Sequence, residues 1–162
     1  MKLFSSKKKL QDTFSFGVNV LADNVASTLG PKGRTVLLHA ARDEYPLITK
    51  DGVTVAKFAT HDDPFANAAM MILKQASIKT NLEAGDGTTT ACVLARSIYE
   101  EALKYIEKGH SPVQIKREME AHLELVLEEI KHRSKKIEDI KELEQVATIS
   151  ANNDAVIGQI IA

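Results

Sequence analysis

Apolar residues recur on one face of a helix in the first part of the chain, at Leu10, Phe14, Val18, Leu21 and Val25. Steps of three and four residues are the spacing of a buried helical stripe, so this pattern predicts a helix that runs to about Leu29. Two glycines and a proline within residues 30–33 then predict a turn, because these residues interrupt regular structure.

Two short runs of strand-forming residues follow this turn. Residues 35–39 and 47–49 are rich in Val, Leu, Ile and Thr, and together they predict a small β-hairpin with a longer connecting loop. Lys50-Asp51-Gly52 predicts a second sharp turn, and residues 53–58 predict a short helix after it.

Proline after a capping residue marks the start of two longer helices. The Asp-Pro pair at 63–64 predicts a helix that reaches about Asn81, and the Ser-Pro pair at 111–112 predicts another that reaches Ile130. Between them, an apolar stripe over 91–105 predicts a helix that ends before the next glycine. The predicted fold class is therefore mainly α with a small hairpin.

The end of the chain carries weaker signals. The polar run 131–136 predicts a boundary, residues 137–146 a shorter helix, and residues 148–152 a turn or an extended connector. Residues 156–161 begin an amphipathic helix. A lone hairpin is marginal in water, and the last helix has no later element to pack on, so we expect later sequence or another subunit to complete both.

Composition narrows the function without defining it. A chain of 162 residues with 44% apolar and 27% charged residues is typical of one globular domain, or one domain and a small piece. The net charge of −1 provides no field that attracts nucleic acid or a membrane, and an aromatic content of 5% without Trp argues against a base-stacking surface.

The single cysteine and the lack of targeting signals indicate the compartment. Cys92 has no second cysteine with which to form an internal disulfide, which favours a reducing environment. No apolar run approaches the length of a membrane span, and the N-terminus lacks the apolar region of a secretory signal. We therefore expect a cytoplasmic protein.

The most informative motif is Gly-Asp-Gly-Thr-Thr-Thr at 85–90. Its glycines permit a tight turn and a close approach of the backbone to a ligand, and its threonines stand where a helix begins. N–H groups without intrahelical partners and the positive end of the helix dipole favour an anion at such a point. Asp86 would offer a carboxylate to Mg²⁺ shared with phosphate oxygens. This pattern favours a Mg-nucleotide site.

Two further turns could join the same site. Residues 28–34 (Thr-Leu-Gly-Pro-Lys-Gly-Arg) end the first helix, and residues 49–52 (Thr-Lys-Asp-Gly) connect a strand to the short helix. Lys50 would neutralise phosphate charge, and Asp51 would orient an attacking water or hold the water shell of the metal.

Each of these motifs also has a purely structural interpretation. Threonine capping explains the glycine turn, basic residues at a helix C-terminus explain the second, and Asp51 as a helix cap explains the third. Cys92 is interpreted as a small core residue. Three such turns between buried elements favour a shared ligand more strongly than any one of them does.

Taken together, these segments resemble the group I chaperonins (the GroEL or heat-shock class), which are ATP-driven folding chambers. The matching segments are 17–23, 28–34, 48–55, 84–91 and 148–152, and their order and spacing agree across the chain. The resemblance implies a mainly α, multi-helix equatorial-type ATP-binding domain with a small β-hairpin, incomplete at its C-terminus. It places the N-terminal half of that domain at 1–133 and the start of the intermediate (hinge) domain at 134–162.

The resemblance also implies ligands and residue roles. The ligands are ATP and Mg²⁺, with K⁺ as a further ion. The residues implied to contact the nucleotide are Thr28, Leu29, Gly30, Pro31, Lys50, Asp86, Gly87, Thr88, Thr89, Thr90, Ile149 and Ser150. Asp86 is implied as the Mg²⁺ ligand and Asp51 as the catalytic residue that arranges the attacking water. Ile149 and Ser150 are implied to lie near the base.

The family implied is a protein-folding ATPase whose subunits form rings. Its regions for client proteins and cochaperonin, and the rest of its pocket, lie in segments that this sequence does not include, so we expect the chain alone to hydrolyse ATP weakly or not at all. Two alternatives remain open. One is a short, non-enzymatic protein that binds or modulates chaperonin rings, and the other is a free-standing helical phosphate-binding module.

Overall fold

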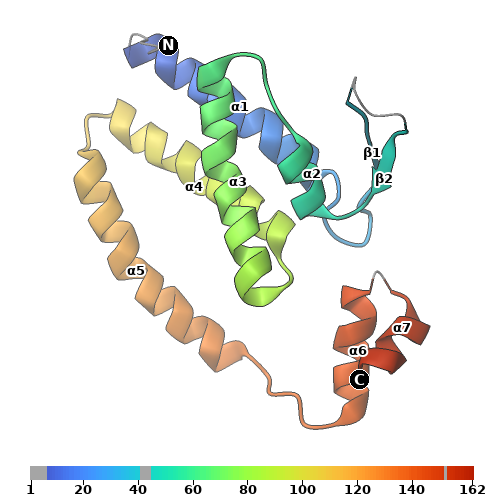
Figure 1. Ribbon diagram of the computed structural model, residues 1–162. Helices are drawn as coiled ribbons and strands as arrows, with labels where there is room; N and C mark the ends of the chain where they lie inside the picture. Colours follow the sequence, from blue (N-terminus) through green and yellow to red (C-terminus); the bar gives the residue numbers. More distant parts are fainter. Residues whose placement is uncertain (1–6, 41–44, 152) are drawn as a thin grey trace. The chain divides into compact units, whose positions relative to one another are not determined.

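The computed structural model describes residues 7–40, 45–151 and 153–162, which form seven helices and one hairpin in that part of the chain (Figure 1). In chain order the elements are α1 (Lys7–Ala26), β1 (Val36–Leu38), β2 (Leu47–Thr49), α2 (Gly52–Phe58), α3 (Pro64–Ala84), α4 (Thr88–Glu107), α5 (Pro112–Arg133), α6 (Ile140–Ser150) and α7 (Ala155–Ile161). The predicted class, mainly α with a small hairpin, is confirmed. The chain divides into two compact units, residues 1–109 and residues 110–162.

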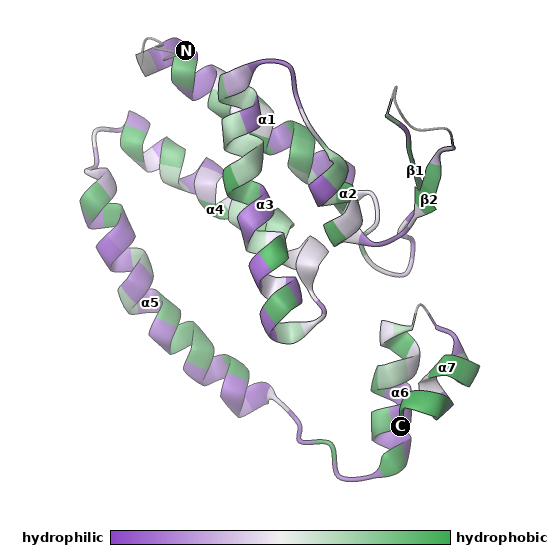
Figure 2. Cartoon of the chain, viewed as in Figure 1, coloured by the Kyte–Doolittle hydropathy of each residue, from purple (hydrophilic) through white to green (hydrophobic). Residues whose placement is uncertain are grey.

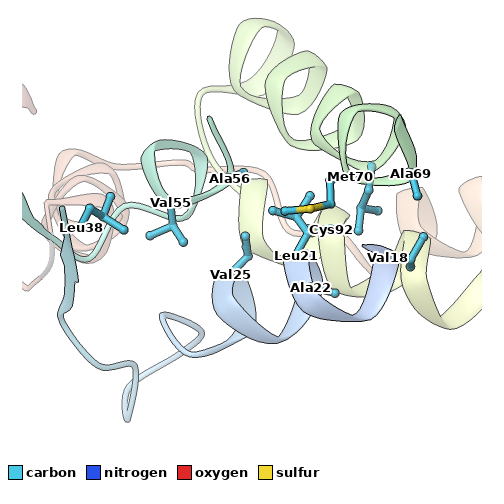
Figure 3. Close-up of a cluster of buried hydrophobic side chains, with 11 residues drawn as sticks. Val18, Leu21, Ala22, Val25, Leu38, Val55, Ala56, Ala69, Met70 and Cys92 are labelled. Atoms are coloured by element: carbon cyan, nitrogen blue, oxygen red, sulfur yellow. The ribbon is translucent and has the colours of Figure 1, made fainter. Parts of the chain in front are cut away.

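In the first unit, α1 packs against α2, α3 and α4. The apolar stripe predicted from the sequence supplies Val18, Leu21 and Val25, which are buried in the core of this unit. Figure 3 shows them with Met70 of α3 and Cys92 of α4. Gly17 lets α1 and α3 approach closely, because a Cβ atom at this position would overlap the backbone of Ala66.

The first helix ends three residues earlier than predicted, at Ala26 rather than at about Leu29. The hydroxyls of Ser27 and Thr28 donate to the carbonyls of Asn24 and Val25, at 2.7 and 2.8 Å. These side chains satisfy carbonyl groups at the helix end and so offer the backbone an alternative to another helical turn.

The hairpin pairs β1 with β2 in antiparallel register, with Val36 opposite Thr49. The second strand has the predicted bounds, and the first is shorter than the predicted run 35–39. Residues 41–44 of the predicted connecting loop lie outside the described residues.

Carboxylates cap two helices of the first unit. Asp51 accepts backbone N–H bonds at the start of α2, and Asp63 does so at the start of α3, where Pro64 is the first helical residue as predicted. The predicted end of α3 at about Asn81 is three residues early. The helix ends at Ala84, and its C-cap is Gly85, whose φ of 73° is left-handed and whose N–H donates to the Asn81 carbonyl.

In the second unit, α5 has no buried residue. Apolar and polar positions alternate along its length (Figure 2). By contrast, α6 packs on α7, and Gly158 makes this possible because a Cβ atom there would overlap the side chain of Thr148.

Two predictions for the second unit were wrong in their bounds. The helix predicted over 137–146 is α6, and it begins at Ile140 because the Asp139 carboxylate caps it through the N–H of Glu142, at 2.8 Å. Residues 148–150, predicted as a turn or connector, form the last turn of α6, while Asn152 lies outside the described residues.

The division into compact units falls after Gly109, whereas the predicted domains are 1–133 and 134–162. Packed bodies and functional domains need not coincide, so the domain assignment stays a prediction. None of the helices in the described part of the chain has the length and apolar composition needed to span a membrane.

Candidate phosphate-binding site

Three turns of the first unit meet at Thr28, Gly52 and Thr89. The hydroxyl oxygens of Thr28 and Thr89 lie 3.2 Å apart, although the residues are 61 positions apart in the sequence. A Cβ atom on Gly52 would overlap Thr89 Oγ1 and would lie 3.4 Å from Thr28 Oγ1. The end of α1, the start of α2 and the start of α4 therefore share one small volume.

The hydrogen-bond direction within the hydroxyl pair follows from proton counting. Thr28 Oγ1 donates to the Val25 carbonyl at 2.8 Å, and a hydroxyl has one proton. Thr89 must then donate to Thr28 when the two bond. Thr89 keeps its lone pairs for another partner, which makes its hydroxyl an acceptor toward a ligand, a water or a cation.

The turn at 85–87 leaves the start of α4 open. Gly85 and Gly87 both have left-handed φ, 73° and 79°, which glycine adopts without steric cost. Gly87 is the N-cap residue, and no side chain caps this helix. The N–H groups in the first turn of α4 have no carbonyl partner within the helix. They lie at the positive end of the helix dipole, which favours an anion.

Asp86 lies exposed within this turn. Its Oδ1 accepts the N–H of Gly87 at 2.6 Å, which fixes the carboxylate beside the start of α4. A carboxylate is the type of ligand that Mg²⁺ takes in nucleotide sites. The residue type and its place beside the first turn of α4 therefore fit the predicted role.

Asp51 is held as a helix cap. Its carboxylate accepts N–H bonds from Val53 at 3.3 Å and Thr54 at 2.9 Å, and also the hydroxyl of Thr54. The neighbouring Lys50 is exposed. The structural interpretation of this turn is thus correct, and the predicted role of Asp51 toward water stays a prediction that the cap does not exclude.

The turn after α1 is fixed by its own backbone. Gly33 N–H donates to the Gly30 carbonyl at 2.9 Å, and Arg34 N–H donates to Ser27 at 2.8 Å. Gly30 has a left-handed φ of 71°. Leu29, Gly30 and Pro31 are exposed, so this predicted set is accessible to a ligand.

Buried residues contact the first turns of α4. Ser77 of α3 is fully buried, and its hydroxyl donates to the carbonyl of Thr88 at 2.9 Å. Burial raises the pKa of the Cys92 thiol, while a hydrogen bond with Ser77 and the charge of Arg96 act in the opposite direction. Cys92 is a core residue, as predicted. Ser77 was missed, although its place in the apolar stripe with Met70 and Leu73 could have drawn attention to it.

Ile149 and Ser150 are not part of this convergence. Both lie at the end of α6 in the second unit, and both are exposed. Ile149 lines a shallow hollow on that unit together with Thr148 and Glu144. Their predicted place beside a nucleotide base stays a prediction.

The described residues thus define a helical protein in which the uncapped start of α4 meets the turns at Thr28 and Gly52. Residues 21–162 match the model of the TCP-1/cpn60 chaperonin family. Since the match spans most of the chain, the chain belongs to this family. The chaperonin resemblance seen in the sequence is confirmed at this level, and assignment to group I is not.

Solved chaperonin structures agree with this assignment. The chain is 29% identical to a group III chaperonin crystallised in the open state, with a TM-score of 0.76 over 93% of this chain and 30% of that one. It is 28% identical to the chaperonin gp146 from the bacteriophage EL 2 (Pseudomonas aeruginosa), in presence of ATP-BeFx, with a TM-score of 0.75 over 94% of this chain and 26% of that one. The chain therefore spans less than a third of the length of either chaperonin.

Proposed function

We propose that the chain is the N-terminal portion of an ATP-dependent chaperonin subunit that assists protein folding and prevents misfolding within a ring. Family membership supports the class. The observation that carries the ATP site is the meeting of Thr28, Gly52 and Thr89, because it brings together the three turns that the sequence suggested for one shared ligand.

In this proposal the first turn of α4 holds the phosphates. After the N-cap Gly87, Thr88, Thr89 and Thr90 bring their backbone N–H groups to the positive end of a helix without a side-chain cap. The turn at Thr28–Pro31 lies along the nucleotide, and Lys50 offsets phosphate charge. Ile149 and Ser150 approach the base from the hinge segment.

Hydrolysis in the proposed subunit is an in-line attack of water on the γ-phosphate. Asp51 orients that water, and its two backbone N–H bonds fix the carboxylate for the task. Asp86 would hold Mg²⁺, and the metal would offset the negative charge that develops on the phosphate oxygens. K⁺ is a further ion for this site, and the acceptor lone pairs of Thr89 suit a cation.

The partners in this proposal are other chaperonin subunits in a homo-oligomeric ring of the group I type, in the cytoplasm. Client proteins and cochaperonin would bind through segments of a subunit beyond those in this sequence. No role for nucleic acid or for a membrane is proposed.

Titration of the 162-residue chain with Mg·ATP tests the site. Amide resonances at 28–33, 50–52 and 85–90 should shift together and saturate. Asp86→Ala should weaken Mg-dependent binding about tenfold or more, because an interaction with a charged group contributes about 1.5–3 kcal/mol.

Asp62→Ala is the matched control, since it removes an exposed carboxylate outside the three turns. It should leave the affinity unchanged. A wild-type chain whose three turns do not respond to millimolar Mg·ATP would contradict the proposed site. Equal losses in the two variants would contradict the role of Asp86.

A further inference from the structure

Helix α3 presents two polar side chains to its neighbours, one helical turn apart. Lys74 and Ser77 are three residues apart, a spacing that places them on the same side of a helix. This helix packs against both α2 and α4, which begin at Gly52 and Thr88. The side chains of α3 are thus placed to act on both helices of the candidate site.

Ser77 bonds the peptide unit that joins Thr88 to Thr89 at the start of α4. Its buried hydroxyl donates to the carbonyl of Thr88 at 2.9 Å. That carbonyl and the N–H of Thr89 belong to one planar peptide unit and point in opposite directions. A hydrogen bond that fixes the carbonyl therefore also fixes where the N–H of Thr89 points.

Lys74 acts on the opposite end of α2. Its ammonium donates to the carbonyl of Lys57 at 3.2 Å and to the carbonyl of Ala59, both at the C-terminus of that helix. A cation is favourable there because the carbonyl end of a helix is negative. Held at this end, α2 keeps Gly52 against Thr89 at the other.

We infer that Ser77 and Lys74 are positioning residues that fix the first turns of α2 and α4 relative to each other for phosphate binding. The inference rests on the proposed ATP site. Neither side chain would touch the nucleotide, and each acts through a backbone carbonyl that it bonds.

The test uses two measurements on the 162-residue chain. The first is ¹⁵N relaxation of residues 50–52 and 88–90 without nucleotide, and the second is the dissociation constant of Mg·ATP. Ser77→Ala should increase fast motion of the Thr89 N–H and raise the dissociation constant about three- to tenfold, the effect expected from losing one hydrogen bond.

Lys74→Met should increase motion at Asp51 and Gly52 and raise the dissociation constant about two- to fivefold. Lys74→Arg, which keeps a cationic donor, should restore part of the affinity. This pair keeps the inference testable should Ser77→Ala unfold the chain.

Two controls separate positioning from general destabilisation. Lys79→Met removes a lysine of α3 that pairs with Glu83 on the surface, and it should change neither measurement. Leu73→Ala removes a buried apolar side chain next to Lys74. It should lower the melting temperature while the dissociation constant, measured well below that temperature, stays within about twofold.

Unchanged motion and affinity in Ser77→Ala and Lys74→Met would overturn the inference, as would equal affinity losses in Leu73→Ala and Ser77→Ala. The two proposals fail separately. A wild-type chain that does not bind Mg·ATP contradicts the proposed function, while the relaxation data still decide whether Ser77 and Lys74 order the two helix starts.

Discussion

Position 52 requires glycine because of a close contact with a neighbouring side chain, and not because of its backbone conformation. Its φ is not left-handed, yet a Cβ atom would overlap Thr89 Oγ1. The hydrogen atom of glycine is what allows the start of α2 to approach the start of α4. The same residue therefore serves the fold and the candidate site.

Gly52→Ala should destabilise the chain by about 1–3 kcal/mol, the range for overpacking a close contact. Denaturant unfolding measures this change. Thr89→Ala in the same chain removes the overlapping hydroxyl, so the double variant should lose less than the sum of the two single losses. Additive losses would show that the contact between Gly52 and Thr89 is not the cause.

Cys92 gives a pH dependence whose sign is fixed by its burial. Burial raises the thiol pKa above its ordinary value of 9.0, so the folded chain keeps the proton to higher pH than the unfolded chain. The stability from this difference is fully present below the unfolded pKa and is lost as pH rises through the folded pKa.

Stability should therefore fall above about pH 9, and it should fall less steeply in Cys92→Ala. Urea unfolding at a series of pH values from 7 to about 10.5 measures both slopes. Other groups titrate alike in the two chains, so their contributions cancel in the comparison. Equal slopes would contradict a buried, neutral thiol.

At the scale of elements, α2 and α4 begin in opposite ways. A carboxylate caps α2, whereas α4 begins at Gly87 without a side-chain cap. Where no side chain accepts the first N–H groups of a helix, those groups are available to an external anion. Where a side chain caps them, the cap stabilises the helix. The difference separates the proposed phosphate-holding helix from the helix that positions Asp51.

Asp51→Ala should cost about 0.5–2 kcal/mol of unfolding free energy, since it removes the cap of α2. Asp63→Ala is the matched control, because it removes the same kind of cap from α3. Both should lower stability by similar amounts in thermal unfolding, whereas only Asp51→Ala should change the response to Mg·ATP. A neutral Asp51→Ala would contradict its role as a cap.

The accuracy of the predicted elements followed the strength of local signals. The starts of α3 and α4 were predicted from residue type alone, because the backbone preferences of Asp63-Pro64 and of the glycines before Thr88 act locally. The end of α1 was placed late because Ser27 and Thr28 bond carbonyls one turn back. The start of α6 was placed three residues early, at 137 rather than at Ile140, because the residue that caps the helix is Asp139.

At the scale of the whole molecule, the chain consists of two packed units with exposed coil within the second. Residues 134–138 are exposed and lie between α5 and α6. Exposed coil of this kind is where proteases cut first. Within the first unit, a basic residue in a packed helix, such as the partly buried Arg96 of α4, is protected better.

Brief trypsin treatment should therefore cut at Lys135 or Lys136 before it cuts at Arg96, and mass spectrometry identifies the sites from the fragments. Cleavage at Arg96, which lies partly buried in α4, should be at least about tenfold slower because it requires local opening of the helix. First cuts at Arg96 would contradict the packing of the first unit.

The sequence by itself determined the fold class, the family resemblance and the three motifs, because periodicity, breakers and caps act over a few residues. It did not reveal that Thr28, Gly52 and Thr89 touch, or that Ser77 bonds the carbonyl of Thr88. Those contacts join residues that are distant along the chain, and packing around α1 and α3 creates them. The chemical character of each motif was therefore predictable from neighbouring residues, whereas the contacts that assemble the site were visible only in the tertiary structure.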